Sequence, residues 1–292
     1  MAMSTQPARL RKMIGEKRMI VAPGAFDALS ARLIEQAGFS ALYVTGAGVA
    51  SSRLGVPDIG LTTMTEMLDA ARNIVNAVGI PVICDMDTGY GNALNLMRAV
   101  REFEAAGAAA LQIEDQVTPK RCGHTEGKQL IEKAEMIQKI RAFQEARRSR
   151  DLVLIARTDA IAVEGFENAV ERARAYVEAG ADVLFVEAPK TIEEMKCIVE
   201  LLPDVPLLVN MVDGGKTPML PARELEAMGF KIAIYPTTAW TAAIKAMQRV
   251  LGRLKETGDA AAFHEDRVSF ETMFEIVGRS QYQRLEKKFL RM

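Results

Sequence analysis

The sequence predicts an α/β fold of the (β/α)8 barrel type, because strand-like and helix-like patterns alternate along most of the chain. Eight short apolar runs rich in β-branched residues occur between residues 19 and 236, and longer amphipathic stretches separate them. Near-continuous apolar runs are typical of parallel strands that are buried on both faces. Eight strand–helix units in about 235 residues match the usual size of this barrel.

The predicted strands are "MIVA" (19–22), "SALYVT" (40–45), "IPVICD" (80–85), "AALQIE" (109–114), "LVLIAR" (152–157), "DVLFVE" (182–187), "PLLVN" (206–210) and "KIAIYP" (231–236). The helical patterns between them end at a glycine, for example in the stretches 92–107 and 166–180, which suits a helix C-cap. An open doubly wound sheet usually has fewer strands and needs a glycine-rich phosphate-binding turn after the first strand. No such turn is present, so the closed barrel is favoured.

Length and charge bound the class of protein. The chain has 292 residues, of which 49% are hydrophobic, and a net charge of −1, so we expect a globular protein with a small-molecule partner rather than nucleic acid or an anionic membrane. No apolar run approaches the roughly 20 residues that span a bilayer, and no signal peptide is evident. Three widely spaced cysteines indicate free thiols, and we therefore predict a cytoplasmic protein.

The pattern after the eighth predicted strand exceeds what a barrel needs. The eighth helix is expected at 237–258, and residues 257–292 read as one or two further helices. We predict a single barrel domain over 1–292 with this C-terminal helical extension. Such an extension often packs on a neighbouring subunit.

Polar residues gather where the predicted strands end, which is the active-site face of these barrels. They are Thr45, Gly46 and Ala47 after the second strand, Asp85 and Asp87 after the third, Glu114 and Asp115 after the fourth, Arg157 and Asp159 after the fifth, Glu187 after the sixth, Asn210 after the seventh, and Tyr235 and Thr237 after the eighth. Any one of these acids could instead cap a helix or pair with an arginine. Several carboxylates at one mouth require a cation or an arginine among them, and an oxygen-only set suits Mg2+ or Mn2+ rather than zinc.

The stretch "TPKRCGHTEGK" (118–128) follows the fourth predicted strand and combines a cysteine, a histidine and two lysines. It offers too few ligands for a zinc site, and it lacks the spacing of a phosphate-binding loop. A catalytic thiol fits better, because Lys120, Arg121 and His124 would lower the pKa of Cys122. The alternative is a buried small hydrophobe, for which this polar loop is a poor place. Gly123 and Gly127 would let the segment move as a lid.

The remaining cysteines are predicted to be structural. Cys84 precedes Asp85 within a strand, so the two side chains should point to opposite faces and Cys84 should face a helix. Cys197 lies within a helical pattern.

The sequence resembles the isocitrate lyase and phosphoenolpyruvate mutase superfamily over almost the whole chain. The sequence motifs that carry the resemblance are "GVPDIGLTTMTEM", "DMDTGYGN", "IEDQVTPKRCGH", "ARTDAIAVEG", "AGADVLFVEAP" and "NMVDGGKTP". The resemblance implies a barrel whose eighth helix is swapped between subunits, a homotetramer built as a dimer of dimers, and Mg2+ held around Asp85, Asp87 and Glu114. It also implies an active-site role for Asp58.

The "KRCGH" word resembles the loop of the carbon–carbon lyase branch of that superfamily. The resemblance implies that Cys122 protonates a carbanion (aci-carboxylate or enolate), while Lys120, His124, Arg157 and Glu187 stabilise charge and relay protons. The implied substrate-binding residues are Thr45, Gly46, Ala47, Asp58, Gly123, Arg157 and Asn210.

The expected substrate is a small 2-hydroxydicarboxylate. The family's tricarboxylate lyases supply arginines where this chain has Thr241 and "VSFETMF", unless Arg267 shifts into register. An unpaired third carboxylate would be costly, so a 2,3-dimethylmalate-like substrate, giving pyruvate and a carboxylic acid, ranks above 2-methylisocitrate. Oxaloacetate hydrolysis or decarboxylation and carboxyphosphonoenolpyruvate mutation stay as alternatives, and a barrel that only binds a ligand ranks last.

Overall fold

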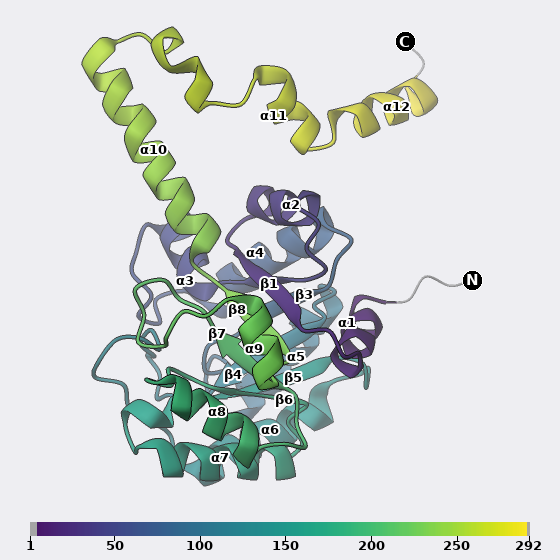
Figure 1. The fold of residues 1–292 in the computed structure, drawn as a ribbon. Helices are drawn as coiled ribbons and strands as arrows, with labels where there is room; N and C mark the ends of the chain where they lie inside the picture. The colour runs from purple at the N-terminus through teal and green to yellow at the C-terminus, as the bar shows by residue number, and fades with distance from the viewer. Residues whose placement is uncertain (1–4, 291–292) are drawn as a thin grey trace. The chain divides into compact units, whose positions relative to one another are not determined.

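A computed structural model describes residues 5–290 of the chain and shows a closed barrel of eight parallel strands (Figure 1). Each strand pairs with the next in sequence, and β1 closes the ring by pairing with β8. The strands are β1 (Ile20–Ala25), β2 (Leu42–Val44), β3 (Val82–Asp85), β4 (Ala110–Glu114), β5 (Val153–Thr158), β6 (Val183–Val186), β7 (Leu207–Asn210) and β8 (Ile232–Tyr235). The predicted (β/α)8 fold and all eight predicted strands are confirmed.

The clearest difference from the predicted boundaries is at β1, which runs three residues past its predicted end. A proline followed by a glycine, here Pro23 and Gly24, is typical of a turn, yet Gly24 pairs with Tyr43 of β2. A side chain at position 24 would lie 2.6 Å from the Cα of Pro236. Glycine is therefore needed here for a close approach of two backbones, and it does not end the strand.

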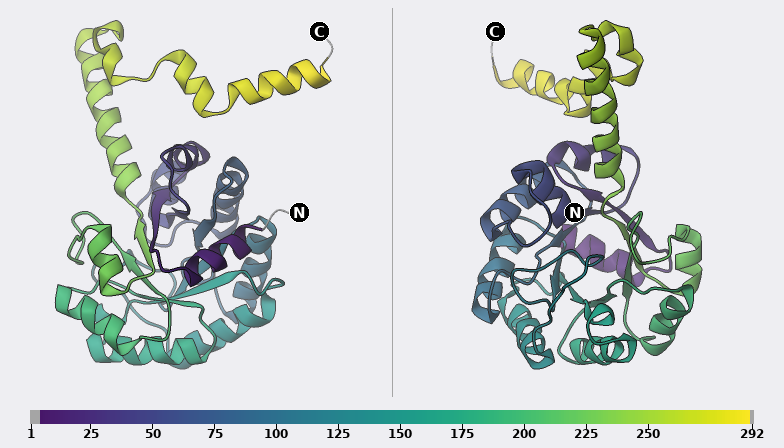
Figure 2. Two further views of the ribbon diagram at one scale, coloured as in Figure 1. Left: turned by 45° about the vertical axis from the view of Figure 1, so that its right-hand side comes forward. Right: turned by 90° about the vertical axis from the view of Figure 1, so that its left-hand side faces the viewer.

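Helices cover the outside of the barrel, and turns connect them to the strands (Figure 2). The helices of the barrel are α1 (Gln6–Gly15), α2 (Ala28–Gln36), α3 (Gly46–Val49), the π-helix η1 (Ala50–Leu54), α4 (Met64–Ala77), α5 (Ala93–Ala105), α6 (Lys133–Ala146), the 3-10 helix η2 (Ala160–Ala162), α7 (Phe166–Glu178), α8 (Ile192–Leu201) and α9 (Ala222–Met228). Capping boxes start α2, α4 and α5. The expected glycine follows α5 and α7 directly after the cap residue, with φ of +93° at Gly107 and +112° at Gly180.

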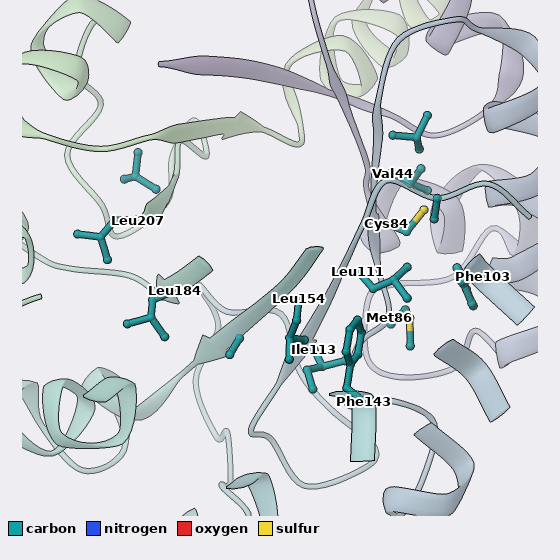
Figure 3. Packing of buried hydrophobic residues seen from close by; sticks show 14 of the residues in the cluster. Val44, Cys84, Met86, Phe103, Leu111, Ile113, Phe143, Leu154, Leu184 and Leu207 are labelled. Atoms are coloured by element: carbon teal, nitrogen blue, oxygen red, sulfur yellow. The ribbon is translucent and has the colours of Figure 1, made fainter. Parts of the chain in front are cut away.

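The core has two layers because successive side chains of a strand point to opposite faces. One layer fills the barrel, and the other lies between the strands and the helices, where Phe103 of α5 and Phe143 of α6 pack with Leu111 of β4 (Figure 3). Cys84 belongs to this outer layer and is fully buried. Its predicted orientation toward the helices is confirmed.

The inner layer continues into polar residues at the carboxyl ends of the strands. Two residues further along a strand the side chain returns to the same face. The inward apolar residues and the polar residues that share their face are Tyr43 and Thr45, Ile83 and Asp85, Ala110 with Gln112 and Glu114, Ile155 and Arg157, Phe185 and Glu187, and Leu208 and Asn210. The polar ring is thus the uppermost layer of the barrel interior.

The chain divides into two compact units, of which the first ends at Thr238 and the second begins at Ala239. The C-terminal elements are α10 (Thr238–Thr257), the 3-10 helix η3 (Ala261–Asp266), α11 (Phe270–Ile276) and α12 (Arg279–Phe289), as expected for an eighth helix followed by a helical extension. None of α10, α11 and α12 contains a buried residue. Within residues 5–290 no helix is both long and apolar enough to cross a membrane.

The two leucines of α5 provide a test of the outer core. Leu96 is fully buried, whereas Leu94 on the same helix is 73% exposed. We expect Leu96→Ala to lower the free energy of unfolding by about 2–5 kcal/mol, since it removes buried methyl groups and leaves a cavity. Leu94→Ala should change it by less than about 0.5 kcal/mol. Urea denaturation followed by circular dichroism measures both, and equal losses would contradict this placement of the helix.

Candidate active site

Two aspartates stand where β3 ends. Asp85 is the last residue of the strand, and its Oδ1 accepts the backbone N–H of Asp87 at 3.0 Å and the side-chain amide of Gln112 at 3.2 Å. Burial, together with the charge of Asp87, raises the pKa of Asp85 to about 6. Asp87 itself adopts a left-handed backbone with φ of +48°, a conformation that aspartate tolerates better than most residues. The two carboxylates are close enough for the charge of Asp87 to raise the pKa of Asp85.

Glu114 ends β4 and is 1% exposed. Its Oε2 lies 3.3 Å from the guanidinium of Arg157, but its Oε1 is buried without a hydrogen-bond partner. Burial raises the pKa of this carboxyl well above its usual range, although Arg157 acts in the opposite direction. A buried oxygen without a donor is costly, so the site calls for further positive charge near Glu114.

These three carboxylates fit a hydrated divalent cation better than a protein cage. Among residues 5–290, no three His, Cys, Asp or Glu side chains are grouped closely enough to enclose a metal ion. Mg2+ prefers oxygen ligands. It usually keeps several of its waters and binds the protein through one or two carboxylates. Asp85, Asp87 and the free oxygen of Glu114 supply that chemistry.

Arg157 connects three carboxylates of the barrel mouth. Its guanidinium makes two hydrogen bonds to Asp159, at 2.9 and 3.0 Å, and lies 3.3 Å from Glu114 and 3.6 Å from Glu187. Burial alone would lower the pKa of Arg157, but the carboxylates outweigh it and raise that pKa well above its usual range. The geometry leads to the same conclusion, because a guanidinium among three carboxylates stays protonated. Arg157 is a permanent cation beside the candidate metal-binding oxygens.

The segment between β4 and α6 folds over this mouth, and we call residues 117–130 the lid. Lys120 reaches down from it to Asp58 at 2.5 Å and to Asp87 at 2.9 Å. Burial lowers the pKa of Lys120, but Asp87 and Asp58 more than offset this and raise it well above its usual value. Asp58, predicted only from the resemblance, is therefore placed at the site by an ion pair with the lid.

His124 of the lid lies between two segments of the barrel rim. Its Nε2 is 3.0 Å from Oε1 of Glu187, and its Nδ1 accepts the backbone N–H of Lys216 at 3.0 Å. Because Nδ1 accepts a hydrogen bond, the ring proton sits on Nε2 and points to Glu187. Asn210 adds longer contacts of 3.4 Å to both His124 and Glu187. Burial raises the pKa of Glu187, but Arg157 and His124 outweigh it, and the net shift is downward.

Cys122 is half-buried on the lid, and its electrostatics differ from the sequence-based prediction. We expected neighbouring cations to lower the pKa of its thiol; instead burial raises that pKa, and the opposing effects of the His124 backbone amide and the charge of Arg157 do not offset it. Lys120 is engaged by two aspartates, and the side chain of Arg121 points away from the site into an exposed position. The thiol is therefore held in its protonated form.

A small cavity of about 70 Å³ lies beneath the lid. Ten of the fourteen predicted site residues line it, namely Thr45, Ala47, Asp58, Asp85, Lys120, Cys122, Gly123, His124, Arg157 and Asn210. The other four touch lining residues: Asp87, Glu114 and Glu187 through the ion pairs above, and Gly46, where a side chain would lie 2.9 Å from Asp85. Gly46 and Ala47 also begin α3, so their backbone N–H groups have no acceptor within that helix.

Sequence reasoning missed several residues that complete the cavity. Tyr43 donates to Gln112 at 2.9 Å, which in turn donates to Asp85, so this chain orients the carboxylate. Val212, Ile234 and Pro236 form an apolar side of the cavity. Strand alternation could have found Tyr43 and Gln112, since each stands two residues before a predicted site residue. A larger cavity, of about 520 Å³, lies at the opposite end of the strands and contains none of the predicted residues.

Comparisons with known proteins identify the family. Residues 10–255 match the family model described as phosphoenolpyruvate phosphomutase. The chain is 47% identical to a 2,3-dimethylmalate lyase of Eubacterium barkeri, with 97% of each chain covered. It is 43% identical to a 2-methylisocitrate lyase of Halalkalibacterium halodurans, with 96% of this chain and 92% of the other covered.

Solved structures agree with that assignment. An oxaloacetate acetylhydrolase in complex with 3,3-difluorooxalacetate superposes with a TM-score of 0.93 at 37% identity, covering 97% of each chain. A phosphonopyruvate hydrolase in complex with oxalate and Mg2+ superposes with a TM-score of 0.90 at 34% identity, covering 99% of this chain and all of the other. The predicted family is confirmed: the chain belongs to the phosphoenolpyruvate mutase and isocitrate lyase superfamily.

Proposed function

We propose that the protein is a Mg2+-dependent carbon–carbon lyase that cleaves a 2-hydroxydicarboxylate of the 2,3-dimethylmalate type into pyruvate and a carboxylic acid. The observation that carries this proposal is the place of Cys122, which the lid brings to a cavity lined by Arg157 and Asp85, while burial raises the pKa of its thiol. A lyase of this kind needs an acid for a carbanion, and a thiol kept neutral by burial meets that need. The identity to a 2,3-dimethylmalate lyase supports the same substrate class.

The cavity favours a short substrate with alkyl substituents. Its cationic groups are Lys120 and Arg157, which suit two carboxylates or one carboxylate and a developing enolate. Val212, Ile234 and Pro236 provide an apolar side against which methyl groups can pack. A third carboxylate pointed at these residues would be buried without a partner, which is costly. These features support 2,3-dimethylmalate over 2-methylisocitrate.

The carboxylates at the ends of β3 and β4 would hold the metal ion. Asp85, Asp87 and Glu114 are the proposed ligands, directly or through water, and Mn2+ could replace Mg2+ because both prefer oxygen. When bound, the ion would supply Lewis-acid stabilisation of negative charge on substrate oxygens. A superfamily neighbour in complex with oxalate and Mg2+ supports this assignment.

The chain's own residues then account for the bond cleavage. The 2-hydroxyl loses its proton, the bond between C2 and C3 breaks, and its electron pair moves into the second carboxyl group to give an aci-carboxylate while C2 becomes the ketone of pyruvate. Arg157 and the backbone N–H groups of Gly46 and Ala47 hold the oxygens. The Sγ–H of Cys122 protonates C3. His124, which is bonded to Glu187, and Lys120 relay the protons between the hydroxyl, the thiolate and solvent.

The assembly and location are also part of the proposal. We propose a homotetramer, a dimer of dimers in which α10 is exchanged between subunits, acting in the cytoplasm without nucleic acid or a membrane as partner. Met247, Leu251 and Leu254 lie on one face of α10 and are 53%, 62% and 41% exposed. Apolar residues at this spacing usually pack on another surface. Three free cysteines are consistent with a reducing compartment.

A substrate panel tests the proposed reaction. We expect pyruvate release from 2,3-dimethylmalate, measured with a coupled dehydrogenase, at a kcat/KM at least ~10-fold above that for 2-methylisocitrate, because the latter leaves one carboxylate unpaired. Oxalate release from oxaloacetate should be slower still. EDTA should abolish turnover and added Mg2+ should restore it. Preferred release of oxalate from oxaloacetate would replace the lyase by the hydrolase alternative, and full activity in EDTA would refute the metal assignment.

Removal of the thiol tests the acid. Cys122→Ser should lower kcat by roughly 10²–10⁴-fold, the usual contribution of a positioned acid. Because burial raises the pKa of the wild-type thiol, the acid form persists to higher pH, and kcat should fall only as the pH rises above about 8.5. Cys197→Ser on α8 is the matched control and should leave the pH profile unchanged. A Cys122→Ser variant with the wild-type rate would disprove the role.

Light scattering tests the assembly. Four chains of 32.0 kDa give 128 kDa, and we expect this mass for the purified protein. Leu251→Glu would place a charge in the proposed interface and should produce smaller species, whereas Glu256→Gln near the end of α10 should not. A wild-type mass of one chain would rule the tetramer out.

A further inference from the structure

Lys128 is a buried lysine at the base of the lid that has no part in the mechanism above. Its side chain is 1% exposed, and it does not line the substrate cavity. Its Nζ lies 3.2 Å from Oδ1 of Asp159 and donates a hydrogen bond to the backbone carbonyl of Gly123. A buried ammonium is costly to desolvate, so its position demands an explanation in terms of these two partners.

The partner on the barrel side is fixed. Asp159 is fully buried and accepts two hydrogen bonds from Arg157, and its own backbone N–H donates to Asp115 at 2.9 Å. Burial would raise the pKa of Asp159, but Arg157 and Lys128 outweigh it and lower that pKa. Asp159 is therefore an anchored carboxylate that neutralises Lys128 in place.

The partner on the lid side, Gly123, packs directly against the barrel. Gly123 adjoins both Cys122 and His124, and a side chain there would overlap the guanidinium of Arg157 and lie 2.7 Å from Cγ of Glu187. Only a bare backbone fits at this point of contact. The bond from Lys128 holds the carbonyl of that backbone when the lid is down.

The two ends of the lid are held together by hydrogen bonds that do not involve Lys128. Val117 N–H donates to the carbonyl of Gln129 at 2.8 Å, and Gln116 bonds both the N–H and the carbonyl of Arg121. The two ends of the lid therefore stay together without Lys128. Lys128 adds a further link between the lid and the barrel, beside the ion pairs of Lys120 and His124, and it is the link that acts on the backbone of Gly123.

We propose that Lys128 is a positioning residue that latches the closed lid, fixing Gly123 and hence Cys122 and His124 over the cavity. The inference rests on the proposed role of the lid in catalysis, but the latch itself is a property of the free protein. Opening the latch should expose Cys122 without loosening the barrel, because Asp159 keeps both hydrogen bonds from Arg157.

Thiol alkylation resolved by peptide mass spectrometry tests the latch. The probe is iodoacetamide on the intact protein, without any substrate. In Lys128→Met we expect Cys122 to react at least ~10-fold faster than in the wild type, since a charge-assisted hydrogen bond of the closed state is lost. Cys84, buried in the outer core, reports on global opening and should react at the wild-type rate. Lys128→Arg, which keeps the positive charge and the donors, should retain at least part of the protection.

The matched control is Gln129→Met, which introduces the same side chain one residue later at an exposed position. It should leave the reactivity of Cys122 unchanged. Unchanged Cys122 reactivity in Lys128→Met, or equal acceleration at Cys122 and Cys84, would overturn the proposal, the latter because the lysine would then support the whole barrel. Turnover gives a second readout: kcat of Lys128→Met should fall by ~10-fold or more. Because alkylation needs no substrate, a failure of the proposed reaction leaves the test of the latch intact.

Discussion

The guanidinium of Arg157 is the interaction on which the candidate active site depends. It lies among Glu114, Asp159 and Glu187, three buried carboxylates that would repel one another without it. The pKa values of the three carboxyl groups shift in different directions: those of Asp159 and Glu187 are lowered, and that of Glu114 is raised. Removing the arginine would leave several uncompensated buried charges, the most costly kind of substitution in a protein interior. Arg157 thus contacts Asp159, which binds Lys128 of the lid, Glu187, which binds His124, and Glu114, which has a buried oxygen without a hydrogen-bond partner.

The barrel and much of its polar mouth could be predicted from sequence because both follow from strand periodicity. Eight apolar runs indicated the strands, and the polar residues at the ends of those runs indicated Asp85, Arg157 and Glu187. Gln112 was missed because only the residues at the ends of the strands were considered, and Gln112 lies inside the apolar run, two residues before Glu114. Lys128 escaped because its contact with Asp159 joins residues 31 positions apart and depends on how the lid folds.

The prediction that the pKa of the Cys122 thiol is lowered was wrong for a related reason: it, too, depends on how the lid folds. Neighbours in sequence were counted as neighbours in space, so Lys120 and Arg121 were expected to stabilise a thiolate at Cys122. In the structure Lys120 is neutralised by Asp58 and Asp87, and burial becomes the dominant influence on the thiol. Sequence spacing reports which charges are near a group, but side-chain direction decides which of them act on it.

A raised thiol pKa also separates two kinds of cysteine chemistry. A nucleophilic cysteine needs its thiolate, which a positive environment stabilises. The closed lid instead buries Cys122 and directs the strongest cations to carboxylates, so the thiol stays a proton donor. An acid aimed at a carbanion must be placed accurately and kept from bulk water, since water would protonate the same carbon without control. Closure of the lid meets both needs at once, because the contact that positions Gly123 against Arg157 also desolvates the neighbouring thiol.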